Sequence, residues 1–196
     1  MLKQDFLVEL GTEELPPKAL LKLSKSFQAG VIEGLKKESL AHGEVKSFAT
    51  PRRLAVLVCA LDEKQADRLT QKFGPAVKAA FDTHGNPTRA ADGFAKSCGV
   101  LVADLGRAPK DGVEKLSFSS TLPGKSTNEL LPAIVDGALA KLPIPKRMRW
   151  GASRDEFVRP VHWLVMLFGE EVVPSTIMGV ESGADSFGHR FHHPDK

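Results

Sequence analysis

Apolar residues recur at helical spacing near the start of the chain. They follow one another at steps of three or four residues, as Leu20, Leu23, Phe27, Val31 and Leu35. This spacing places one apolar stripe on a helix that reaches about residue 41. Pro16 and Pro17 suit its first turn, where the N–H groups that proline lacks are not needed. The pattern therefore predicts an amphipathic helix that begins near these prolines.

Short apolar runs on either side of this helix predict strands. One run, at 6–10, precedes the helix, and two more, at 45–48 and 54–61, follow it. Pro51 lies between the last two, where a proline is confined to a strand start or a sheet edge. Residues 1–62 are therefore expected to form a first α+β unit.

The next stretch, 63–112, is rich in alanine and glycine. Residues 84–87 have the composition of a turn, and Thr88 is expected to cap a short helix that runs to Cys98. We therefore expect residues 63–112 to form a small helical insertion.

The earlier order of elements returns after residue 112. Residues 115–119 alternate like a half-buried strand, residues 131–142 have helical spacing, and 146–150 and 161–168 are again strand-like. Ser126 and Glu129 have the spacing of a capping box, with Asn128 as a rival cap. Pro132 favours Asn128, because a proline inside the helix would remove a hydrogen bond. Residues 113–196 are expected to form a second α+β unit that continues past residue 196.

Two pairs of short, similar segments suggest that the second unit repeats the first. Residues 14–17 resemble 129–132, and residues 48–51 resemble 157–160. Together with the order of elements, they predict an internal β-α-β-β duplication. The expected fold class is α+β: a mixed, largely antiparallel sheet with helices on one face, a possible duplication and a small helical insertion.

Composition narrows the class of protein. The chain has 196 residues, of which 42% are hydrophobic and 26% charged, which is typical of a globular protein. Two cysteines, Cys59 and Cys98, favour a reduced, cytoplasmic protein over a disulfide scaffold. The longest apolar stretch, 163–168, is far shorter than the roughly 18 residues that a membrane span needs. No membrane partner is expected.

The formal charge of +3 is unevenly distributed. Residues 1–15 contain one lysine and four carboxylates, whereas residues 141–160 contain six lysines and arginines and two carboxylates. Such a basic stretch is either a solvated face or a binding surface for an anionic partner such as RNA.

Motifs for catalysis and metal binding are weak in this chain. Gly124-Lys125-Ser126 lacks the glycine that a phosphate-binding loop needs five residues earlier, where Ser119 stands. The histidines at 189, 192 and 193 match no established metal motif. No serine or cysteine is marked by an adjacent base. We expect no catalytic residue and no metal site here.

Basic and aromatic side chains are the better candidates for function. Arginine and lysine neutralise phosphates, and Trp150 either stacks on an unpaired base or belongs to the core. The candidate contact residues for tRNA or for a partner subunit are Arg52, Arg53, Lys146, Arg147, Arg149, Trp150, Arg159, His162, His189, Arg190 and His192.

Six segments in order carry a resemblance to a known family. They are LVELGTEELPP at 7–17, FATPRRL at 48–54, PTRAADGF at 87–94, MRWG at 148–151, FVRPVHW at 157–163 and GHRF at 188–191. As a set they resemble the N-terminal portion of the beta subunit of bacterial heterotetrameric glycyl-tRNA synthetase. Phe187 departs from the pattern, since a basic residue is expected before Gly188.

The resemblance implies a role in an α2β2 enzyme that joins glycine to its tRNA. In that family, ATP, Mg²⁺ and glycine are used at the alpha subunit. The beta subunit is much longer than this chain and supports tRNA recognition. The resemblance therefore implies that this segment holds no complete active site and no cofactor, and that it contacts glycine tRNA, the alpha subunit, or both. The alternative is a protein-interaction scaffold that binds the alpha subunit with no direct RNA contact.

Overall fold

The computed structural model describes residues 2–152 and 154–188, which divide into two compact units. The main unit comprises the described residues of Met1–Ala66 and Lys125–Lys196, and the inserted unit is Asp67–Gly124. Each unit has its own sheet and helices, and each is described by itself.

The main unit is built on a seven-stranded sheet with the order β11-β12-β9-β1-β3-β2, in which β10 pairs with β9. All its strand pairs are antiparallel except that of β12 and β9. The predicted mixed, largely antiparallel sheet is confirmed. Its strands are β1 (Lys3–Thr12), β2 (Val45–Thr50), β3 (Arg53–Asp62), β9 (Val161–Phe168), β10 (Glu171–Val172), β11 (Thr176–Ile177) and β12 (Val180–Gly183).

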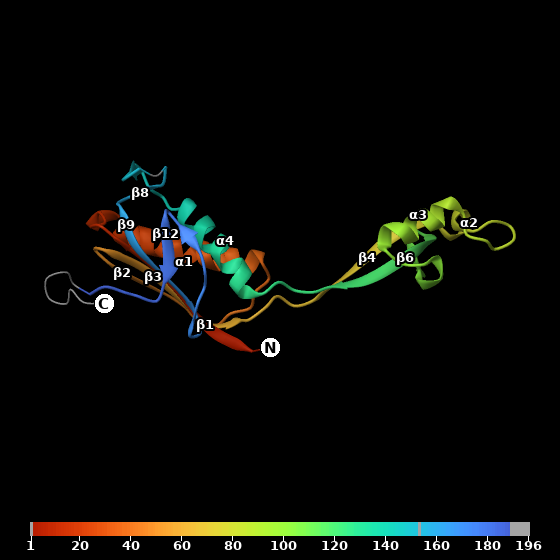
Figure 1. Cartoon of the computed structure of the whole chain (residues 1–196), viewed down its shortest axis with the longest axis horizontal. Coiled ribbons are helices and arrows are strands. Elements are labelled where there is room, and N and C mark those ends of the chain that lie inside the picture. The colour runs from red at the N-terminus through yellow and green to blue at the C-terminus, as the bar shows by residue number, and fades with distance from the viewer. Residues whose placement is uncertain (1, 153, 189–196) are drawn as a thin grey trace. The chain divides into compact units, whose positions relative to one another are not determined.

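Two helices, α1 (Pro17–Lys37) and α4 (Thr127–Ala140), cover one face of this sheet (Figure 1). The predicted stripe of α1 is buried in the main core, apart from the half-buried Leu20. The two helices lie close together because α1 has glycines where they meet. A Cβ built on Gly30 would stand 2.9 Å from the Cβ of Ala138, and one on Gly34 would stand 2.6 Å from Cγ2 of Ile134. Glycine thus permits the approach of the two backbones.

The start of α4 differs from the prediction. Ser126, not Asn128, is the N-cap, and its hydroxyl accepts a hydrogen bond from the backbone N–H of Glu129 over 3.4 Å. Pro132 therefore lies inside the helix. The prediction that Pro132 would shift the cap to Asn128 is wrong, because burial of Leu131 and other apolar residues of α4 compensates for one missing hydrogen bond.

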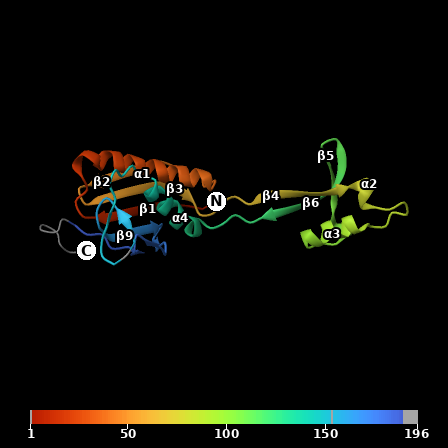
Figure 2. The same ribbon diagram turned by 90° about the horizontal axis from the view of Figure 1, so that it is seen from above.

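The inserted unit contains strands as well as the predicted helix. A three-stranded antiparallel sheet has the order β4-β6-β5, and α3 lies beside it (Figure 2). Its elements are β4 (Arg68–Ala76), α2 (Val77–Ala80), α3 (Arg89–Cys98), a 3₁₀ turn (Val102–Asp104), β5 (Gly106–Lys110) and β6 (Val113–Leu122). The strand that the duplication would equate with β1 is β6, and it pairs with β4 and β5 instead of joining the larger sheet.

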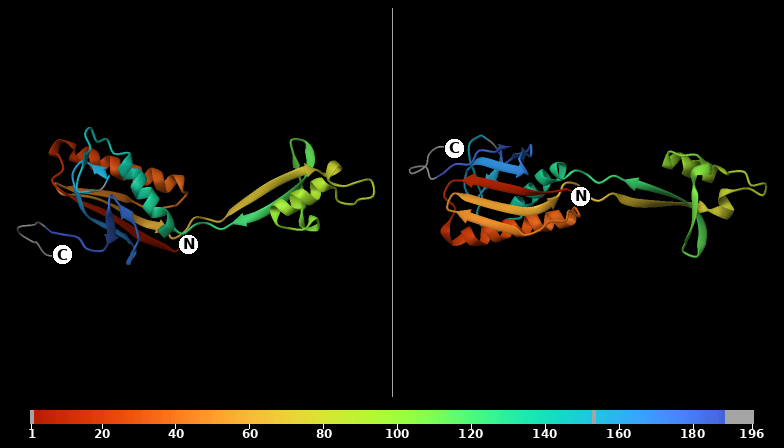
Figure 3. Two further views of the ribbon diagram at one scale, coloured as in Figure 1. Left: turned by 45° about the horizontal axis from the view of Figure 1, so that its top comes forward. Right: turned by 90° about the horizontal axis from the view of Figure 1, so that it is seen from below.

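No helix among the described residues of the main unit covers the second face of the main sheet (Figure 3, right), and the strand register places apolar residues of β1, β3 and β9 on this face. The register puts Leu7, Leu57 and Leu167 in one row across the central strands, and Ala55, Glu9 and Val165 in the next. A short hairpin, β7 (Met148–Arg149) with β8 (Glu156–Phe157), completes the main unit. None of the helices in the described part of the chain is long and apolar enough to cross a membrane.

Candidate contact surface

The loop that follows β1 is held by two proline-containing segments. The backbone N–H of Glu13 donates to the carbonyl of Pro160 over 3.0 Å, and that of Leu15 donates to the carbonyl of Pro51 over 2.6 Å. These prolines are the last residues of the two similar segments, 48–51 and 157–160. The two similar segments therefore bind the same loop through their proline carbonyls. These hydrogen bonds fix the positions of Glu13 and Glu14.

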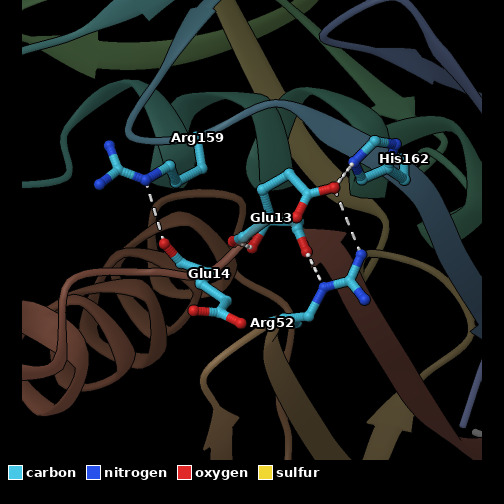
Figure 4. A network of polar contacts seen from close by, with 6 residues as sticks. Glu13, Glu14, Arg52, Arg159 and His162 are labelled. Carbon is cyan, nitrogen blue, oxygen red and sulfur yellow. Dashed lines mark hydrogen bonds and ion pairs between the residues drawn. The ribbon is translucent and has the colours of Figure 1, made fainter. Parts of the chain in front are cut away.

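Glu13 is the centre of a polar network at the surface (Figure 4). Its Oε1 lies 2.9 Å from Nε2 of His162 and 3.5 Å from Nη2 of Arg52. Arg52 also donates through Nε to the carbonyl of Thr12 over 3.2 Å. The structure thus brings together two predicted contact residues, but it supplies both with a carboxylate of the same chain.

Arg159 lies beside this network with a different set of partners (Figure 4). Its Nε donates to the carbonyl of Glu14 over 3.0 Å and its Nη1 to the carbonyl of Val158 over 3.1 Å. Within the described residues, no carboxylate pairs with Arg159. Neutral carbonyls orient this guanidinium and leave its positive charge uncompensated.

Arg53 belongs to a separate cluster on the second face of the sheet. Its Nε lies 3.4 Å from Oε1 of Glu9, and its guanidinium carbon lies 5.9 Å from the ring centroid of Trp163. The Nε···Oε1 contact lacks hydrogen-bond geometry and is therefore ionic only. Arg53 also donates to the carbonyl of Phe187.

Glu9 is the buried member of this second cluster, with 7% of its surface exposed. It accepts hydrogen bonds from Nε1 of Trp163 over 2.8 Å and from the hydroxyl of Ser186 over 2.6 Å. The carboxylate therefore attaches the segment around Ser186 to the sheet. Sequence reasoning missed Glu9, Trp163 and Ser186; the available signal was an acidic residue inside the apolar run 6–10.

The basic segment at 146–150 is only partly available to a partner. Arg147 donates to the carbonyl of Ala140 over 2.8 Å, at the last residue of α4, and Arg149 forms a 2.6 Å ion pair with Glu156. Trp150 is half-buried and packs against the main core. Lys146 is exposed and has no ion pair in the described part of the chain.

Comparison with known proteins identifies the family. The model of the glycyl-tRNA synthetase beta subunit family matches residues 6–196. This chain belongs to that family. The resemblance read from the six segments is confirmed.

Curated relatives agree over the whole chain. It is 55% identical over 195 residues to the glycine–tRNA ligase beta subunit of Pseudomonas entomophila and 54% identical over 194 residues to that of Hahella chejuensis. The alignments cover 100% and 99% of this chain, but 28% of each relative. The chain therefore spans about 28% of the length of the beta subunits it matches.

Three of the predicted contact residues of this family member, His189, Arg190 and His192, lie outside the described residues. Among the residues that are described, no group of three histidine, cysteine or acidic side chains could hold a metal ion. The candidates that the structure does describe lie in the Glu13 network, beside it at Arg159, in the Glu9 cluster and in the segment 146–150.

Proposed function

We propose that this chain is the N-terminal part of a glycine–tRNA ligase beta subunit and supports ATP-dependent attachment of glycine to its tRNA in the cytoplasm. The family match over residues 6–196 carries the proposal. ATP, Mg²⁺ and glycine act at the alpha subunit, and this part of the beta subunit supplies binding surface. The free thiols of Cys59 and Cys98 suit a reducing compartment.

The test is a glycylation assay with two combinations of subunits. Alpha subunit with full-length beta subunit is expected to charge glycine tRNA, whereas alpha subunit with residues 1–196 alone is expected to be inactive. Charging by the second pair at a comparable rate would contradict the proposal, because this chain would then supply everything that the beta subunit contributes.

The contact partner is a tRNA, the alpha subunit, or both. Arg52, Arg149 and His162 already have carboxylates of the same chain, which supports the scaffold alternative with no direct RNA contact. Each carboxylate also repels phosphate and offsets the attraction of its cation. Direct tRNA contact is supported by Lys146 and Arg159, for which the described residues supply no ion pair.

Neutralising Glu13 distinguishes these two candidates. If the surface faces tRNA, Glu13→Gln in full-length beta subunit removes a repulsive charge beside Arg52 and His162, so tRNA affinity rises and falls more steeply with salt. If the surface is a scaffold only, tRNA binding is unchanged. Glu44→Gln is the matched control, because Glu44 also forms an exposed ion pair, at 3.2 Å with Lys46, on the edge strand β2.

A further inference from the structure

An apolar groove lies between the start of α1 and the segment that follows α4. It encloses about 570 Å³. Most of its lining is aliphatic, and Met148, which is 39% exposed, contributes a flexible thioether. The lining residues are Pro16, Ala19, Leu23, Pro143, Ile144, Pro145, Lys146, Met148, Val158 and Arg159.

The wall formed by residues 143–145 is rigid. Pro143 and Pro145 fix their own φ angles, and the N–H of Ile144 donates to the carbonyl of Leu142 over 2.8 Å. Ile144 also packs against the main core. A preformed wall loses little conformational entropy when a partner binds, which favours a binding surface over a collapsible gap.

The charges that line the groove are all positive. Lys146 and Arg159 are its only charged lining residues, and neither has an ion pair within the described residues. On α1, Lys22 stands three residues after Ala19 and is exposed, so helical spacing adds a third cation at the side of the groove. An apolar floor with a cationic rim is complementary to an apolar side chain flanked by carboxylates.

We propose that this groove binds an acidic polypeptide segment of the alpha subunit, which inserts an aliphatic or aromatic side chain between Ala19, Ile144 and Met148 and places a carboxylate on Lys146 or Arg159. The choice of the alpha subunit rests on the proposed function. The cations at the rim of the groove are exposed, and exposed charges speed the encounter of two separate proteins in solution. This favours a second polypeptide chain as the partner.

RNA fits this groove less well than a peptide does. Single-stranded RNA is bound by stacking its bases on aromatic rings or on arginine planes. None of the lining residues is aromatic, and the one arginine, Arg159, is held by the carbonyls of Glu14 and Val158. A small metabolite would need several convergent polar groups for its orientation, and the lining side chains supply only the two cations.

The test measures association of purified alpha subunit with full-length beta subunit by titration calorimetry at several salt concentrations. Lys146→Glu and Met148→Glu are each expected to weaken the association by about tenfold or more. The Lys146→Glu variant should also lose part of its salt dependence. Lys72→Glu, a reversal of an exposed cation on β4 that also has no ion pair within the described residues, is the matched control and should leave the affinity unchanged. Both groove positions are exposed, and unchanged thermal unfolding of each variant establishes that it is folded.

An array of overlapping 15-residue peptides from the alpha subunit, probed with full-length beta subunit, locates the segment. The proposal expects acidic peptides with an apolar centre to bind wild type and to lose binding to Lys146→Glu.

Each alternative occupant gives a different result, and each overturns the proposal. If Lys146→Glu binds the alpha subunit as wild type does but binds tRNA more weakly, RNA occupies the groove. If the variants bind the alpha subunit as wild type does but the isolated beta subunit unfolds at a lower temperature, a later segment of the beta subunit occupies the groove. Full glycylation with unchanged association by both variants refutes the groove while the proposed function stands. A wild-type pair that neither associates nor charges tRNA refutes both.

Discussion

The indole ring of Trp163 fills the space above Gly11, its partner across the β1–β9 ladder. A Cβ built on Gly11 would lie 1.9 Å from Cε2 of Trp163, far inside van der Waals contact. The contacted atoms belong to the middle of the indole, so a small movement of the tip does not relieve the clash. The position therefore requires glycine for reasons of space.

Gly11→Ala is expected to lower the free energy of unfolding by about 1–3 kcal/mol, because the added methyl displaces Trp163. Gly137→Ala is the matched control. Gly137 lies inside α4 and its Cβ would meet nothing within 4 Å, so alanine should stabilise the helix by about 0.5–1 kcal/mol. Urea unfolding of both variants measures the two effects, and equal stabilities would contradict the clash.

Trp163→Phe is expected to destabilise the main unit by about 1–3 kcal/mol, since the buried carboxylate of Glu9 loses the N–H donor that lies 2.8 Å away. The same substitution at Trp150, which packs against the main core from a half-buried position, removes indole volume at a second site and serves as the control. Urea unfolding is the measurement. A smaller loss at Trp163 than at Trp150 would show that the hydrogen bond to Glu9 is unimportant.

Ser126→Ala is expected to lower the free energy of unfolding by about 1 kcal/mol, because Ser126 caps α4. Asn128→Ala should lower it less, since Oδ1 of Asn128 is buried without a hydrogen-bond partner among the described residues. Thermal or urea unfolding compares the pair. A larger loss of stability in Asn128→Ala than in Ser126→Ala would show that Asn128 is the cap.

The ion pair between Glu33 on α1 and Lys141 at the end of α4 predicts a dependence of stability on pH. The hydrogen bond and charge of Lys141, 2.9 Å away, lower the pKa of Glu33 from its ordinary value of 4.5. A lowered pKa stabilises the fold above the ordinary value, and this stabilisation is lost as the pH falls through the folded-state pKa.

Glu33→Gln should therefore be less stable than wild type at pH 7. The difference should shrink between about pH 5 and pH 2, where the wild-type carboxyl is protonated. Urea unfolding at both ends of this range measures it, and added salt should reduce the difference at pH 7. A difference that persists at low pH would mean that the ion pair is not its cause.

The strands and helices with strong local patterns were predictable. The stripe from Leu20 to Leu35 identified α1, and the apolar runs identified β1, β3 and β9, because burial of one face imposes its period on the sequence. The N-cap of α4 was not predictable from the local sequence. Pro132 costs one helical hydrogen bond, but packing of α4 against α1 and the sheet outweighs this cost.

The candidate contact surface was only partly predictable. Basic residues could be named from their type, but their partners could not, since Glu13 and His162 are 149 residues apart and Glu9 and Ser186 are 177 apart. Such pairs form only when strands far apart in the sequence lie side by side. The groove likewise depends on the approach of residues 143–148 to the start of α1.

By itself, the sequence determined the α+β class, the main helices and strands, and the resemblance to the glycyl-tRNA synthetase beta subunit, because periodicity and motifs are properties of neighbouring residues. Only the tertiary structure decided that β6 pairs within the inserted unit, that carboxylates of the same chain pair with Arg52, Arg149 and His162, and that Lys146 and Arg159 line an apolar groove. The physical reason is that strand pairing, ion pairing and grooves depend on distances between remote segments, which no local pattern encodes.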